Sequence, residues 1–142
     1  MKLCSACLLG IRCRFDGQSK PDPKVMALAR KEVLIPVCPE QLGGLPTPRN
    51  PAEQRGGKVI TQIEDDVTEQ YRKGAEDVLA IAYILGIKEA AFKQRSPACG
   101  VGKIYDGTFS ERIVKGDGVT TALLKKNKIS VISEEDLPDE EN

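Results

Sequence analysis

The chain has 142 residues, with 21 basic and 21 acidic side chains and no net charge. This balance, without a basic block, argues against binding to nucleic acid or to a membrane through bulk charge. No apolar run approaches the roughly 20 residues of a transmembrane helix, and the first residues lack the layout of a signal peptide, so we expect a cytoplasmic protein. We expect one domain spanning residues 1–142, with a flexible, solvated acidic tail over about residues 134–142.

Apolar runs alternate with helix signals along the chain. The signals include Pro23 directly after the capping residue Asp22, and a helical recurrence of apolar residues that closes at Gly86. In chain order the predicted segments are a strand at 3–6 that ends near Cys7, a helix at 22–29, a strand at 33–37, a loop at 39–54, a strand or hairpin arm at 57–63, a helix at 68–85, a strand at 87–93, a helix opened by 118–120 and a strand at 129–132. This alternation predicts an α/β, three-layer Rossmann-like fold with a mostly parallel sheet and helices on both faces.

The sequence contains five cysteines and no histidine. The absence of histidine removes the commonest general base and the commonest nitrogen ligand for metals. In a reducing compartment, five cysteines are not expected to form a disulfide framework. Any chemistry therefore depends on cysteine, carboxylate, amine, guanidinium or hydroxyl groups, or on a bound cofactor.

Three of the cysteines fall at the predicted carboxyl ends of three strands. These are Cys7, Cys38 and Cys99. In open parallel sheets, ligands bind outside the carboxyl ends of the strands, so neighbouring strands would bring the three thiols together. Three thiolates suit a soft metal ion or an iron–sulfur cluster. The alternative is that these cysteines are small apolar residues packed at strand ends.

The other two cysteines allow further interpretations. Cys4 and Cys7 form a C-x-x-C pair, the spacing of a redox dithiol. However, Cys4 is expected inside a strand and no helix is predicted to begin at Cys7. Cys13 is a candidate fourth ligand, although we favour a structural or supporting role.

The sequence resembles the bacterial family known as domain-of-unknown-function family 523, whose characterised member is a thiouracil desulfurase. Lys93 and a set of ordered motifs carry this resemblance across nearly the whole chain. The motifs are SACLLG at 5–10, CRFDG at 13–17, CPE at 38–40, GGLPTPR at 43–49, DVT at 66–68, SPACG at 96–100, YDGTF at 105–109 and GDGVT at 116–120. Ala98 is a departure, because the family commonly has serine there.

The resemblance implies an enzyme with an oxygen-sensitive [4Fe-4S] cluster, which aerobic preparation can remove. It implies that Cys7, Cys38 and Cys99 hold the cluster and that the fourth iron takes the sulfur of a thiouracil-like nucleobase. It also implies that Glu40 is the catalytic carboxylate and that Ser96 is its hydroxyl neighbour. The expected partner is therefore a small thiolated pyrimidine. The resemblance does not identify the molecule that accepts the sulfur.

Four further polar residues are candidates for the substrate site or its surroundings. Arg49 and Lys93 are expected to bind or neutralise charge, or else to anchor a loop and solvate a strand end. Asp16 and Asp106 suit turn capping better than catalysis. Two other functions stay open: a non-catalytic iron–sulfur or zinc protein, and a dithiol redox protein that uses Cys4 and Cys7.

Overall fold

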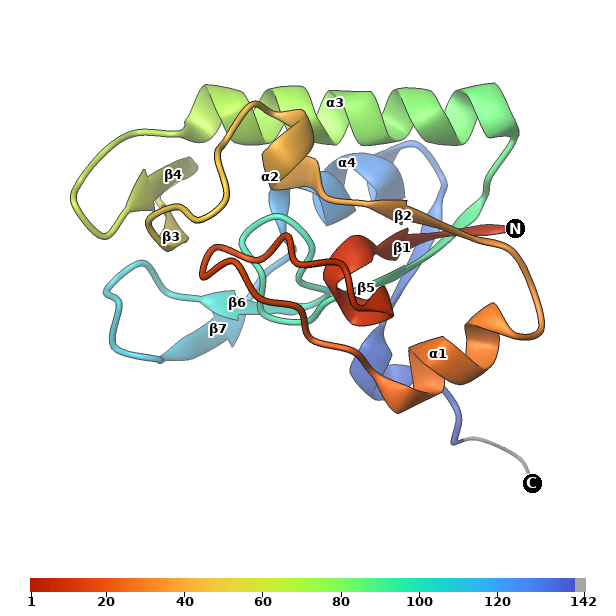
Figure 1. Ribbon diagram of the computed structural model, residues 1–142. Coiled ribbons are helices and arrows are strands. Elements are labelled where there is room, and N and C mark those ends of the chain that lie inside the picture. Colours follow the sequence, from red (N-terminus) through yellow and green to blue (C-terminus); the bar gives the residue numbers. More distant parts are fainter. Residues whose placement is uncertain (140–142) are drawn as a thin grey trace.

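The centre of the molecule is a parallel sheet of four strands. The computed structural model describes residues 1–139 (Figure 1). The strands are β1 (Lys2–Ser5), β2 (Leu34–Val37), β5 (Glu89–Phe92) and β8 (Ser130–Ser133), and they lie in the order β2-β1-β5-β8. All three pairings are parallel. The predicted parallel sheet is confirmed, and the three strands that precede Cys7, Cys38 and Cys99 are neighbours.

Helices cover both faces of this sheet. The helices α3 (Thr68–Leu85) and α4 (Val119–Lys126) pack together on one face, and α1 (Pro23–Ala29) lies on the other (Figure 1). Successive residues of a strand point to opposite faces, so Leu3 joins the core under α3 and α4 while Cys4 joins a smaller core under α1. Asp22 caps α1 as predicted, accepting hydrogen bonds from the first amides of that helix. The predicted α/β fold with helices on both faces is confirmed.

Two short helices, one strand and a second hairpin differ from the sequence-based expectation, whereas the strand or hairpin arm expected at 57–63 is confirmed. The first strand ends at Ser5 and continues as the 3-10 helix η1 (Ala6–Leu9), so Cys7 lies in a helical turn. The expected loop at 39–54 begins as the helix α2 (Pro39–Leu42) and ends in strand β3 (Ala52–Arg55), which pairs with β4 (Lys58–Thr61). A second hairpin joins β6 (Lys103–Tyr105) to β7 (Ile113–Lys115). These elements are three or four residues long, too short for a periodic pattern to identify.

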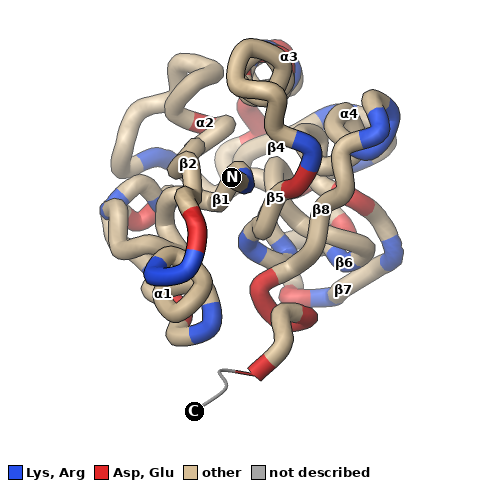
Figure 2. Tube along the Cα trace, turned by 90° about the vertical axis from the view of Figure 1, so that its right-hand side faces the viewer, with Lys and Arg blue, Asp and Glu red and all other residues tan. Residues whose placement is uncertain are grey.

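The expected boundary of the solvated tail is wrong. Glu134 begins the 3-10 helix η2 (Glu134–Asp136), and its side chain is buried. That carboxylate accepts a hydrogen bond from the backbone amide of Gln94 (2.8 Å) and lies 3.5 Å from the ammonium of Lys93. Glu134 is therefore held against the end of the sheet, in the acidic segment that directly follows β8 (Figure 2). Residues 140–142 of the expected tail lie outside the described residues.

The helix α2 packs on α3 with its backbone in direct contact. Two glycines allow this approach, Gly43 at the end of α2 and Gly74 inside α3. A Cβ atom on Gly74 would overlap the carbonyl of Pro39, and one on Gly43 would overlap the carbonyl of Gln70. Since Cys38 and Glu40 flank Pro39, this contact fixes the position of both residues relative to α3.

Candidate functional site

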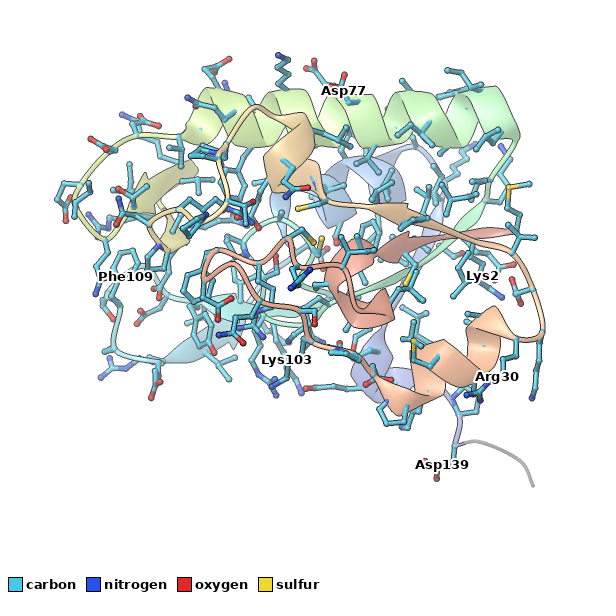
Figure 3. The ribbon with its side chains drawn as sticks, in the orientation of Figure 1. Lys2, Arg30, Asp77, Lys103, Phe109 and Asp139 are labelled. Carbon is cyan, nitrogen blue, oxygen red and sulfur yellow. The ribbon has the colours of Figure 1, made fainter. Side chains whose placement is uncertain are left out.

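A cavity of about 730 Å³ opens at the carboxyl ends of the strands, and its lining includes Cys7, Cys38 and Cys99. Cys7 lies in η1, Cys38 follows β2 and caps α2, and Cys99 lies in the loop after β5. Phe109, another lining residue, lies at the end of the molecule toward which the strands run, opposite Lys2 (Figure 3). Three thiols that are distant in the sequence therefore line one cavity, as the strand order predicts.

Cys13 lies among these thiols and is also part of the cavity lining. The Cys38 thiol donates to the carbonyl oxygen of Cys13 at 3.7 Å. A hydrogen bond with Cys38 lowers the pKa of the Cys13 thiol, but a hydrogen bond with Cys7 and burial outweigh it and raise this pKa to about 11. The hydrogen bond between Cys13 and Cys38, together with burial, raises the pKa of the Cys38 thiol. Burial raises the pKa of the Cys99 thiol. The raised pKa values of Cys13, Cys38 and Cys99 favour their protonated forms, so a metal that binds such a thiol must displace its proton.

The loop that carries Cys99 is held from two sides. The Ser96 hydroxyl oxygen accepts hydrogen bonds from the amides of Ala98 (3.1 Å) and Cys99 (3.0 Å). On the other side, the first amides of α4 donate to carbonyl oxygens of residues 97 and 98 at 2.9 Å. Gly118 lies so close to this loop that a Cβ atom there would overlap the Ala98 carbonyl group. Ser96 therefore shapes the loop, and its hydroxyl also forms a hydrogen bond with the Cys99 thiol, which lowers the pKa of that thiol against the larger effect of burial.

Glu40 is the carboxylate closest in the sequence to a lining thiol, and two donors converge on one of its oxygens. The hydroxyl of Tyr71 donates to Oε1 at 2.8 Å, and Nε of Arg49 donates to the same atom at 3.1 Å. The side chains of Glu40 and Arg49 are only 17% and 6% exposed. Within residues 1–139, Oε2 of Glu40 accepts no hydrogen bond and remains free for a ligand.

Arg49 also joins three segments of the chain. Its Nη2 donates to the carbonyl oxygen of Cys13 at 2.8 Å, and its Nη1 donates to Thr47 and to the carbonyl oxygen of Pro46. Its own amide donates to the carbonyl oxygen of Phe15 at 2.8 Å. The guanidinium therefore anchors its loop and the Cys13 segment beside the Glu40 carboxylate.

The remaining candidates separate into cavity residues and turn residues. Lys93 lines the cavity, where its ammonium donates to the carbonyl oxygen of Gln94 and pairs with Glu134. Asp16 accepts from the amide of Gln18, two residues on. Asp106 accepts from the amide and hydroxyl of Thr108, and these hydrogen bonds lower the pKa of its carboxyl group. Both aspartates lie outside the cavity lining and cap turns.

Cys4 lies within β1 and is fully buried. Burial, followed by the charges of Asp22 and Glu134, raises the pKa of its thiol to about 12. A reactive dithiol needs one exposed cysteine with a low pKa, and Cys4 has neither property. The C-x-x-C spacing is therefore better explained by the strand position of Cys4 than by redox chemistry.

The donor set of the cavity fits an iron–sulfur cluster. Three thiols from separate elements line one space, and a fourth, Cys13, lies beside them. In the part of the chain that the structure describes, no three Cys, Asp or Glu side chains gather closely enough to hold one metal ion. Cysteines that bind a cluster each take a different iron atom, so wider spacing of the thiols is compatible with a cluster.

Comparison with known proteins identifies the family. The sequence profile described as 2-thiouracil desulfurase matches residues 3–136. The chain belongs to this family. The solved structure of the [4Fe-4S]-dependent thiouracil desulfidase TudS, also designated DUF523, is 45% identical and has a TM-score of 0.91, covering 96% of this chain and 92% of that one. The protein YbbK of Bacillus subtilis (strain 168) is 43% identical over 98% of this chain and 99% of its own length. The resemblance found in the sequence is thus confirmed.

Among the residues that line the cavity, Tyr71 has a contact with Glu40 that the sequence does not predict. The spacing of Tyr71 within the helix predicted at 68–85 matches only the apolar face of that helix. The structure buries its ring and directs its hydroxyl to Glu40. A buried tyrosine needs a partner for its hydroxyl, which was the one signal available from the sequence.

Within residues 1–139, no helix combines the length and the apolar character needed to cross a membrane.

Proposed function

We propose that this protein is a [4Fe-4S]-dependent desulfurase that converts a thiolated pyrimidine such as thiouracil into its oxo form. The observation that carries the proposal is the convergence of Cys7, Cys38 and Cys99 on one cavity that Glu40 also lines. Membership of the 2-thiouracil desulfurase family and the 45% identity to the thiouracil desulfidase TudS support it.

Cys7, Cys38 and Cys99 would hold the cluster as thiolates. A cluster held by three protein thiolates would leave one iron without a protein ligand and would supply a soft Lewis acid for the substrate sulfur. Cys13 would remain beside the ligands as a supporting thiol. Free cysteines and a cluster of this kind suit the reducing cytoplasm, where we place the protein.

Glu40 would act on the water that replaces the sulfur. The net reaction exchanges a ring C=S group and one water for a C=O group and hydrogen sulfide, so two water protons must be moved. Oε2 of Glu40 is free to accept one proton as water adds to the ring carbon, and to return it to a departing group. Arg49 complements the negative charge of the carboxylate through Oε1.

Ser96 and Lys93 would bind the polar edge of the pyrimidine. The Ser96 hydroxyl lies beside the Cys99 thiol, with which it is hydrogen-bonded, and it would donate to a ring oxygen or nitrogen once Cys99 binds the cluster. The Lys93 ammonium carries three hydrogens; it donates one to the carbonyl oxygen of Gln94 and also pairs with Glu134, which leaves donor capacity for a ligand. Both residues line the cavity with the thiols.

The proposal is tested by anaerobic turnover of 2-thiouracil and 4-thiouracil. Protein reconstituted with iron and sulfide is expected to form uracil and hydrogen sulfide, because the cluster would supply a Lewis acid in the cavity that Glu40 also lines. Chromatography of the pyrimidines and a sulfide assay measure the two products. The same chain treated with a chelator under anaerobic conditions is the control and is expected to be inactive. Reconstituted protein that carries a full cluster but turns over neither substrate would contradict the proposal.

A further inference from the structure

Tyr71 is a buried residue that belongs to both the core and the cavity. It lies in the first turn of α3, the residue is 1% exposed, and it forms part of the cavity lining. Its ring packs in the core beneath α3, while its hydroxyl donates to Oε1 of Glu40 at 2.8 Å. The ring position is therefore fixed by packing, and the direction of the hydroxyl follows from it.

We propose that Tyr71 is a positioning residue that holds Glu40 in the orientation required for proton transfer. This inference rests on the proposed function, in which Oε2 of Glu40 accepts a proton. Arg49 alone would bond Oε1 from one direction and leave the carboxylate free to rotate about its last torsion. A second donor from α3 on the same oxygen restricts that rotation and keeps Oε2 as the oxygen available to the reacting water.

The backbone on both sides of this hydrogen bond is also held. Gly74, one helical turn after Tyr71, lets the α3 backbone touch the Pro39 carbonyl, directly before Glu40 in the chain. The carboxylate and its donor thus share a rigid helix–helix contact, whereas Arg49 reaches Glu40 from a loop. A group fixed in this way is placed to within a fraction of an ångström, and displacement of about 1 Å is enough to slow catalysis about 100-fold.

Tyr71 is suited to donate rather than to exchange a proton. Burial raises the pKa of its hydroxyl well above the ordinary value for tyrosine, and the negative charge of Glu40 raises it further. The hydroxyl therefore stays protonated across the working pH range. Its role is confined to holding Glu40, and it does not compete with Glu40 for the protons of the reaction.

The test is Tyr71→Phe, which keeps the ring and removes the hydroxyl. In anaerobically reconstituted protein, we expect kcat for thiouracil to fall about 10- to 100-fold, with KM and the cluster absorption spectrum unchanged. Tyr83→Phe is the matched control, because Tyr83 lies on the same helix and is 71% exposed. It is expected to leave every measured quantity unchanged. Tyr71→Phe with parental kcat, alongside an inactive Glu40→Ala, overturns the positioning role and leaves the proposed function intact.

A double-mutant cycle with Glu40→Ala supplies a readout that does not depend on turnover. If Tyr71 acts through Glu40, Tyr71→Phe lowers the thermal midpoint of the parental holoprotein but not that of the Glu40→Ala holoprotein. An equal decrease in both backgrounds overturns the inference, because Tyr71 would then contribute only to packing. A Glu40→Ala variant with parental kcat would instead contradict the proposed function itself.

Discussion

Replacing any one of Cys7, Cys38 and Cys99 by alanine is expected to abolish the visible absorption of the reconstituted cluster and all desulfuration. Each of these thiols comes from a different element, so no neighbouring ligand can substitute for the one removed. A cluster with only two protein thiolates is expected to be lost under the conditions in which the parent retains it. Anaerobic reconstitution, followed by iron analysis and the absorption spectrum, measures the effect.

The two other cysteines provide matched controls for this series. Cys4→Ala removes a buried thiol that lies in the smaller core under α1. This variant is expected to keep the full cluster. Cys13→Ala removes a thiol from the cavity itself and is expected to keep it too. If Cys13→Ala loses the cluster while Cys7→Ala keeps it, the proposed ligand set is wrong. If Cys4→Ala alone abolishes activity, the dithiol alternative is favoured.

Glu40→Gln is expected to retain a complete cluster and to lose turnover by about 10²- to 10⁴-fold, the range typical of a missing acid–base residue. Glutamine has the same shape, and its amide oxygen can still accept from Tyr71 and Arg49. It lacks the second basic oxygen, which is the atom that the structure leaves free. The measurements are kcat for thiouracil and the cluster absorption of the same sample.

A second carboxylate of the cavity serves as the control for this substitution. Glu111 also lines the cavity, but its side chain is exposed. Glu111→Gln changes the cavity charge by the same amount and is expected to leave kcat within about twofold of the parent, as for a surface substitution. Equal losses in both variants would mean that cavity charge, and not proton transfer by Glu40, supports turnover.

The sheet and the convergence of the thiols could be predicted because both follow from long-range regularities. Apolar strands between helices imply a parallel sheet, and the carboxyl ends of its strands meet at one edge. The rule that parallel strands end at one edge of the sheet is enough to place Cys7, Cys38 and Cys99 near one another. Thus the sequence predicted the cavity edge correctly, although η1 rather than the strand itself carries Cys7.

The parts of the site that escaped prediction depend on contacts between distant short segments. The helix α2 is four residues long and lies against α3 through Gly43 and Gly74, a contact that no local pattern reveals. Burial of Glu134 likewise depends on the amide of Gln94, which lies forty residues earlier in the chain. Tyr71 matched an apolar helix face, and only the fold shows that its hydroxyl meets Glu40.

The most direct measurement of the central claim is Mössbauer spectroscopy of anaerobic protein reconstituted with ⁵⁷Fe, recorded with and without thiouracil. If Cys7, Cys38 and Cys99 are the only protein ligands of a [4Fe-4S] cluster, one iron is expected to differ from the other three. Thiouracil is then expected to change the spectrum of that iron alone. Four iron atoms with thiolate ligands and no response to thiouracil, or protein that binds only zinc, would contradict the account.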